Sequence, residues 1–258
     1  MPEHASTALP CSMELRTLAG FPVLHEEDGW LALNKPSGLP VHRGYTGERQ
    51  TLVDLLRHKL PSGAVHTVHR LDRGTSGVLL VATQIEMAQA LQECFARREV
   101  RKVYLALARG VVPEEVEIDS PVPAGPEQQA PRVEARTRVR RLAFVQLEAS
   151  PLQESRYSLI LAEPETGRFH QVRRHLSHIA HPLIGDSNHG RPEHNRLLRA
   201  RVGLSRLALH ARELLLRHPL TGAPVRIRAP LPEDLTKPLQ ALGFDVNGLL
   251  QAAEDGIH

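Results

Sequence analysis

Residues 69–82 read HRLDRGTSGVLLVA, a polar turn that runs directly into a continuous apolar segment. The apolar part has the length of a strand and predicts one that is buried on both faces. Gly74 and Gly77 bracket the turn, because glycine adopts backbone conformations that other residues avoid. Asp72 therefore precedes a buried strand, where a carboxylate is well placed to face a cleft. Spacing alone favours the simpler alternative, a turn aspartate that accepts backbone hydrogen bonds.

The sequence on either side of this segment predicts strands and helices that do not alternate strictly. Strands are expected at 30–34, 77–82, 101–110, 133–147, 157–163 and 207–216, and helices at 51–59, 86–99 and 167–180. Hairpin-like pairs recur, which favours an α+β fold with a central mixed, mostly antiparallel sheet and flanking helices and loops. The proline-rich residues 119–131 predict a loop or insertion without stable structure. We expect residues 1–20 to be flexible and residues 21–258 to form a single domain.

The composition narrows the class of protein. Of the 258 residues, 41% are hydrophobic and 24% charged, which is typical of globular proteins. Cys11 and Cys94 are too few for a disulfide framework or a zinc site, which favours a cytoplasmic location. No apolar run approaches the ~20 residues of a membrane span, and the N-terminus lacks the pattern of a signal peptide. We expect no membrane association, and a monomer by default.

Positive charge is concentrated in one part of the chain. Residues 168–228 contain twelve arginines, three acids and no lysine, a surplus of nine positive charges. Because guanidinium groups bind phosphate through a planar fork of donors, this surplus favours a surface that binds nucleic acid. The alternative is a solvated surface in a chain that uses arginine in place of lysine.

The predicted helix at 167–180 places a cation among apolar residues. Arg173 lies on the same face as the apolar stripe, which consists of Phe169, Val172, Leu176 and Ile179. A guanidinium on a core-facing stripe is costly unless it is paired with an acid, and Asp72 is a candidate partner. The alternative is that Arg173 extends to solvent.

Histidines cluster in the same region, at His170, His175, His178 and His181. A zinc site is conceivable, but no carboxylate lies between His175 and His178 as in the zinc-binding helix pattern. Arg173 and Arg174 would also repel a cation. We therefore predict structural or nucleic-acid-facing histidines and no bound metal.

Tyr104 is one of three tyrosines and lies on the predicted strand 101–110. An aromatic ring that faces a cleft from a strand can stack on a nucleobase. Packing in the hydrophobic core explains the residue equally well.

Four ordered segments together resemble the RluA-type pseudouridine synthases. Residues 34–42 (NKPSGLPVH) resemble the first motif of the family, and residues 69–80 resemble its catalytic motif. Residues 101–106 (RKVYLA) resemble the strand that carries the active-site tyrosine, and residues 166–186, from TGRFHQVRRHL to HPLIGD, resemble the third block. The resemblance spans about residues 24–230. It implies the catalytic α+β fold of that family, without an N-terminal S4 domain because the first motif begins so early.

The resemblance also implies roles for individual residues. Asp72 would be the nucleophile, Tyr104 would stack on the base and transfer a proton, and Arg173 would pair with Asp72. Arg70 would fill the gap left by a flipped nucleotide, and no cofactor is implied. The predicted RNA-binding residues are Arg70, Lys35, His42, Arg168, His170, Arg174, Arg191 and Arg196. The arginine-rich residues 168–228 are expected to line the side that faces RNA.

A finer resemblance concerns residues 185–190, which read GDSNHG. His189 stands where many relatives carry tyrosine. This pattern is similar to the branch of the family that modifies uridine 65 of tRNA. The alternatives are a synthase for 23S ribosomal RNA, a catalytically silent RNA-binding protein, and a metal-dependent hydrolase that uses the histidine cluster.

Overall fold

The computed structural model describes residues 16–43, 50–60, 63–127, 129–147, 152 and 155–255. Its strands are β1 (Thr17–Leu18), β2 (Phe21–Glu27), β3 (Trp30–Lys35), β4 (His66–Thr67), β5 (Ser76–Ala82), β6 (Arg101–Arg109), β7 (Glu115–Asp119), β8 (Val122–Pro123), β9 (Arg132–Val133), β10 (Arg136–Gln146), β11 (Arg156–Pro164), β12 (Leu209–Arg217) and β13 (Pro224–Arg228). Its helices are α1 (Leu52–Arg57), α2 (Ile85–Ala96), α3 (Gln171–His178), α4 (Pro192–Val202), α5 (Glu233–Ala241) and α6 (Val246–Asp255).

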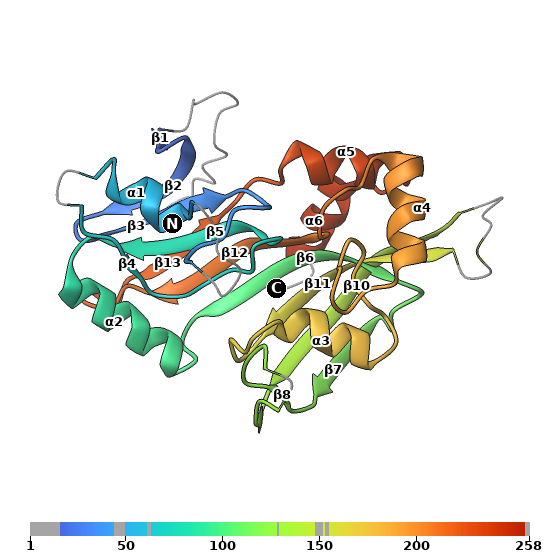
Figure 1. The fold of residues 1–258 in the computed structure, drawn as a ribbon, viewed down its shortest axis with the longest axis horizontal. Coiled ribbons are helices and arrows are strands. Elements are labelled where there is room, and N and C mark those ends of the chain that lie inside the picture. The colour runs from blue at the N-terminus through green and yellow to red at the C-terminus, as the bar shows by residue number, and fades with distance from the viewer. Residues whose placement is uncertain are drawn as a thin grey trace, which may run out of the picture.

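Within the described residues, eleven strands form a mixed sheet with helices around it (Figure 1). The main path runs β1-β2-β3-β5-β12-β6-β11-β10-β7, with β13 beside β12 and β4 beside β5. The pairing of β12 with β5 is parallel, whereas the neighbouring pairs β3–β5 and β12–β6 are antiparallel. The predicted α+β fold with a mixed, mostly antiparallel sheet is therefore confirmed.

The two halves of the sheet meet where β5 lies beside β12. The parallel pairing covers His210 with Ser76 and Ala211 with Gly77. Gly77 has φ 113°, and a Cβ atom at this position would lie 2.1 Å from the Ala211 carbonyl oxygen. Glycine is therefore required here, both for the backbone angle and for the close approach of the two strands.

The N-terminal half of the sheet is covered on both faces. On β5, Leu79 and Val81 pack in a cluster with α1, whereas Val78 and Leu80 pack in a cluster with α2. Every residue of β5 is buried, as its continuous apolar sequence predicted.

The C-terminal half follows the same principle. Ala106 of β6 packs in a cluster with α3, and the adjacent Leu105 and Leu107 pack in a cluster with α5 and α6. Because successive side chains of a strand point to opposite faces, even-numbered residues of β6 face α3. Tyr104 is one of these residues, so it lies on the face that carries the catalytic segments.

Several predicted boundaries need correction. Residues 119–131 are not simply an unstructured loop, because Val122 pairs with Val133 in the short β8–β9 hairpin. Thr17 and Leu18 pair with β2, so the predicted flexible segment already contains a strand, and residues 1–15 lie outside the described residues. Helix α3 begins at Gln171, because residues 167–170 form the turn before it. No element was expected at β2, β4, β7, β13, α4, α5 or α6.

Candidate active site

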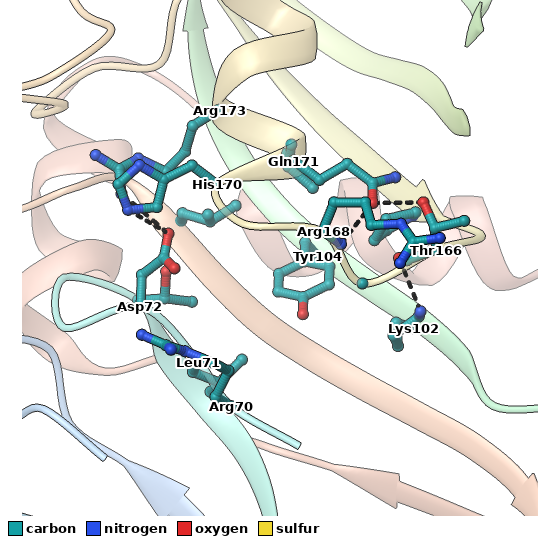
Figure 2. A pocket seen from close by; sticks show the side chains of 15 residues that line it. Arg70, Leu71, Asp72, Lys102, Tyr104, Thr166, Arg168, His170, Gln171 and Arg173 are labelled. Carbon is teal, nitrogen blue, oxygen red and sulfur yellow. Dashed lines mark hydrogen bonds and ion pairs between the residues drawn. The ribbon is translucent and has the colours of Figure 1, made fainter. Parts of the chain in front are cut away.

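Three residues that lie far apart in the sequence line one pocket at the junction of the two half-sheets. Asp72 comes from the turn before β5, Tyr104 from β6, and Arg173 from α3 (Figure 2). In Figure 2, Asp72 lies on one side of the Tyr104 ring and Lys102 on the other. The structure thus brings together the three residues that the family resemblance singled out.

Arg173 holds two carboxylates at once. Its Nη1 donates to Asp72 Oδ2 at 3.0 Å. Its Nε and Nη2 donate to Asp186 Oδ2 and Oδ1, both at 2.8 Å, which is the bidentate geometry of a strong guanidinium–carboxylate pair. Nη2 also donates to Asn188 Oδ1 at 3.1 Å. Arg173 is therefore buried and paired, and does not extend to solvent.

Asp186 is the functional residue that the sequence reasoning missed. Its side chain is 0% exposed, against 19% for Asp72, so it is the more deeply buried partner of Arg173. It also accepts hydrogen bonds from the backbone amides of Asn188 and His189 at 2.9 and 3.0 Å. Burial opposes ionisation, but the hydrogen bond and the charge of Arg173, followed by these two amides, outweigh it and lower the pKa of Asp186. Its place in the GDSNHG segment was the available signal.

Lys35 supports the catalytic turn from inside the protein. It is 0% exposed, and its Nζ donates to the carbonyl oxygens of Pro36 and Leu39, both at 2.8 Å, and of Arg73 at 3.3 Å. Burial, followed by the nearby Arg206 cation, lowers the pKa of Lys35 to about 7. Lys35 was predicted to contact RNA. Its ammonium group is instead buried among carbonyl oxygens, where it presents no surface to RNA.

A second buried polar network lies behind the same turn. Ser76 Oγ lies 2.8 Å from His210 Nδ1 and accepts from Arg206 Nη2 at 2.6 Å. Arg206 Nη1 donates to Asp234 Oδ1 at 2.8 Å, which connects the turn to α5. Such a network holds Ser76, four residues after Asp72, in one position.

Tyr104 presents a neutral phenol to the pocket. Its ring is half-buried and packs against the hydrophobic clusters of both half-sheets. Burial, with a smaller contribution from the Asp72 carboxylate, raises the pKa of Tyr104 well above its ordinary value. Tyr104 was expected either to face a cleft or to pack in the hydrophobic core. It does both, because it packs on the core and also lines the pocket.

A pair of histidines adjoins Asp72. His170 Nε2 lies 3.8 Å from Asp72 Oδ2, and His170 Nδ1 lies 3.0 Å from His189 Nε2. Burial is the main cause that lowers the pKa of His170 to about 4, so both nitrogens belong to a neutral ring at pH 7. The backbone of His170 is left-handed, with φ 53°, which is costly for a residue other than glycine.

The other clustered histidines point elsewhere. His175 lies within 2.8 Å of Thr137 Oγ1 and 2.9 Å of the Ser120 carbonyl oxygen, and His181 lies 2.9 Å from the Arg109 carbonyl oxygen. Across the residues that the structure describes, there is no group of three or more histidine, cysteine, aspartate or glutamate side chains able to hold a metal. These histidines instead bind the backbone and side chains of neighbouring elements.

The remaining predicted RNA-binding residues fall into two groups. Arg70 and Arg168 are exposed at the edge of the pocket, and His42, Arg191 and Arg196 are exposed outside it. Arg174 has a different position. Its Nη1 donates to the carbonyl oxygens of Pro123 and Phe169, and its Nη2 to that of Gly125. The Arg174 guanidinium therefore ties the β8–β9 hairpin to α3, which occupies donors that RNA would need.

The arginine-rich residues 168–228 do not line one RNA-facing side, and this prediction is wrong. Arg212 pairs with Glu254, and Arg226 and Arg228 pair with Glu213. All of these residues except Arg228 line a pocket together with Arg101 and Val103, which point to the face of β6 opposite Tyr104. The surplus was counted along the chain, whereas in the fold acids from outside the counted window, such as Glu254, neutralise part of it.

Known proteins with similar sequences identify the family of this chain. A family model described as RNA pseudouridylate synthase matches residues 29–178. The chain belongs to this family. It is 40% identical over 220 residues to the tRNA pseudouridine synthase C of Haemophilus ducreyi, which covers 81% of this chain and 90% of the relative. It is 36% identical over 242 residues to the protein of that name from Vibrio cholerae, which covers 89% and 99%.

Solved structures of the family share the fold. Human RNA pseudouridylate synthase domain containing 4 superposes with a TM-score of 0.67 and 27% identity, over 86% of this chain and 92% of that one. Human RNA pseudouridylate synthase domain containing 1 superposes with a TM-score of 0.69 and 25% identity, over 94% and 98%. The pocket around Asp72 thus lies in the catalytic fold of an RNA pseudouridine synthase.

Proposed function

We propose that this pseudouridine synthase isomerises a uridine of tRNA, at position 65, with Asp72 as the catalytic nucleophile. The observation that carries the proposal is the contact between Asp72 and the buried Arg173 in a pocket whose opposite side is Tyr104. Relatives named tRNA pseudouridine synthase C, at 40% and 36% identity, support tRNA as the substrate. The segment GDSNHG, with His189 in place of tyrosine, supports position 65.

The reaction requires a carboxylate beside the ribose and no external reactant. An Asp72 oxygen forms a bond to C1′ as the bond from N1 to C1′ breaks, and uracil leaves with that electron pair. The uracil rotates within the pocket, and C5 bonds to C1′ as Asp72 is released. The C5 proton is lost and N1 gains a proton, so atoms and charge balance. Arg173 holds one Asp72 oxygen and thereby leaves the carboxylate oriented toward the sugar.

Tyr104 would hold the detached uracil during this rotation. A neutral phenol ring stacks on a base without placing a second negative charge beside Asp72. Leu209 and Lys102 also line the pocket, which limits the space in which uracil can move. As a neutral phenol, Tyr104 can donate a proton to the base, whereas only its phenolate form could accept one.

The first prediction concerns the nucleophile. Asp72→Asn replaces a partly exposed carboxylate with an isosteric amide, so it should abolish pseudouridine formation by at least about 10⁴-fold while RNA affinity stays within about threefold. The measurements are tritium release from RNA that carries tritium at C5 of its uridines, and filter binding with the same transcript. Turnover by the variant at the wild-type rate, after purification away from host synthases, would show that Asp72 is not the nucleophile.

The target is tested by mapping pseudouridine in tRNA and in 23S ribosomal RNA from cells with and without the gene. Loss confined to tRNA position 65, restored by the wild-type gene and not by the Asp72→Asn variant, is expected. Loss at a ribosomal position instead would favour the alternative substrate, and no loss at any position would favour the silent RNA-binding protein. The proposal includes a cytoplasmic location and action as a monomer.

A further inference from the structure

A second groove opens directly off the catalytic pocket, and we call it the outer groove. Phe95, Ala96 and Arg98 at the end of α2 form one wall, and the turn 166–168 lies opposite. Lys102 and Tyr104 line both the outer groove and the catalytic pocket. A chain of nucleotides that places one base beside Tyr104 therefore has a continuous path into the outer groove.

The outer groove is strongly positive. Its lining includes four cations, of which Arg70, Arg98 and Arg168 are exposed. The fourth, Lys102, is buried, and its Nζ donates to the carbonyl oxygens of Thr166 and Glu165, so it adds charge to the groove without a free donor at the surface. No aspartate or glutamate lines it within the described part of the chain. The pocket on the opposite face of β6 also contains arginines, but there Glu163, Glu213 and Glu254 pair with them. The contrast identifies the outer groove as a place where positive charge is left for a ligand.

The acids nearest to Arg98 in the sequence, Glu93 and Glu99, do not line the outer groove. Glu93 pairs with Arg97. Arg98 instead lies close enough to Lys102 that, after burial, its charge is the second cause that lowers the pKa of Lys102 to about 8. Two cations held together without an acid gain stability from a bound anion.

The backbone presents Arg98 in an unusual conformation. The residue follows the last turn of α2 with φ 62°, in the left-handed region, and its amide donates to the Phe95 carbonyl oxygen at 3.2 Å. An arginine pays a conformational cost in this region that glycine or asparagine largely avoids. We therefore expect the guanidinium of Arg98 to have a function that offsets this conformational cost.

We propose that the outer groove binds a backbone phosphate of the RNA beside the nucleotide in the catalytic pocket, and that Arg98 is a direct contact to it. The inference rests on the proposed RNA substrate and adds a binding residue outside the four family segments. Phosphate suits the groove because it brings the negative charge that the four cations lack, and because a guanidinium can donate two parallel hydrogen bonds to it.

The test compares two neighbouring arginines in the Asp72→Asn background, so that binding is measured without turnover. Arg98→Asn removes the cation and keeps a side chain that tolerates the left-handed backbone, and Arg98→Gly is a second such variant. Arg97→Asn is the matched control, because Arg97 is exposed, pairs with Glu93 and does not line the groove. The probe is an unmodified tRNA transcript, titrated between 50 and 300 mM KCl, a range of about sixfold chosen because phosphate contacts depend on salt.

We expect Arg98→Asn to weaken binding about five- to tenfold at 100 mM salt, and to reduce the slope of log affinity against log salt by about one. Arg97→Asn should change neither quantity by more than about twofold, and Arg98→Lys should restore most of the slope. Equal effects of the two asparagine variants, or an unchanged slope for Arg98→Asn and Arg98→Gly, would overturn the inference. Failure of the proposed function is distinguishable, because it appears as absence of pseudouridine when wild-type protein acts on the same transcript.

Discussion

Arg173 connects catalysis and stability through a single guanidinium. The fork toward Asp186 uses Nε and Nη2, and only Nη1 remains for Asp72. Asp186 is fully buried and Asp72 is partly exposed, so loss of Arg173 leaves the larger uncompensated charge on Asp186. The residue that positions the nucleophile is therefore itself positioned by a second carboxylate.

Loss of Arg173 and loss of the Asp72 carboxylate should affect the stability of the protein to different extents. Arg173→Leu should lower the free energy of unfolding by about 3–5 kcal/mol, because it strands the buried Asp186 charge. Asp72→Asn should change it by less than about 1 kcal/mol, because it removes one hydrogen bond at a partly exposed site. The measurement is urea unfolding followed by circular dichroism. Arg173→Lys serves as a control, since it keeps the charge without the fork and should fall between the two. Equal stability of Arg173→Leu and wild type would contradict the pairing.

At the scale of elements, β12 determines where the active site forms. This strand lies between β5, which follows the catalytic turn, and β6, which carries Tyr104. Ala211 of β12 pairs with Gly77 on one side and with Tyr104 on the other. Because Ala211 is small and Gly77 has no side chain, the strands approach closely enough to bring Asp72 and Tyr104 into one pocket.

A substitution at this junction tests its importance. Gly77→Ala should destabilise the protein by at least about 3 kcal/mol, because its Cβ would overlap the Ala211 carbonyl and because alanine disfavours φ 113°. Gly167→Ala is the control, since nothing lies within 4 Å of a Cβ atom there, and its effect should stay within about 0.5 kcal/mol. Thermal and urea unfolding provide the comparison. Unfolding of Gly77→Ala at the wild-type urea concentration would mean that β5 and β12 separate without cost.

Over the whole molecule, the buried histidines make stability depend on pH. Burial lowers the pKa of both His69 and His210 from 6.5 to about 3. His69 Nε2 accepts from the Leu80 amide, and His210 contacts Ser76, so both rings remain neutral in the folded protein. Among the helices that the structure describes, none is long and apolar enough to cross a lipid bilayer.

The protein should become less stable as the pH falls below about 6.5. Between pH 6.5 and 3 the unfolded chain binds two protons that His69 and His210 do not bind in the folded state, so stability falls as pH falls through this window. Each histidine contributes about 1.4 kcal/mol per pH unit, or about 2 kcal/mol between pH 6.5 and pH 5. Urea unfolding at pH 7 and pH 5 measures the loss, and His210→Gln should reduce its slope by about one proton. A stability that is constant over this range would show that these rings titrate normally.

The pattern of apolar and polar residues predicted those elements that depend on short stretches of the chain. The apolar run after Gly77 predicted the fully buried β5, and the alternation at 101–110 predicted β6 with Tyr104 on one face. The position of Arg173 on a core-facing stripe left two alternatives, a carboxylate partner or extension to solvent, and the structure shows the first. Asp72 and Arg173 were named as partners from these patterns and from the family resemblance.

The sequence by itself thus determined strands β3, β5, β6, β10, β11 and β12, the catalytic segment and the candidate pairing of Arg173 with a carboxylate. Only the tertiary structure decided that Asp186 supplies the larger share of that pairing, that Lys35 points inward, and that many arginines of residues 168–228 face acids instead of RNA. The physical reason is that burial and charge depend on distance in space. A count along the chain cannot include an acid such as Glu254, which folding brings beside Arg212.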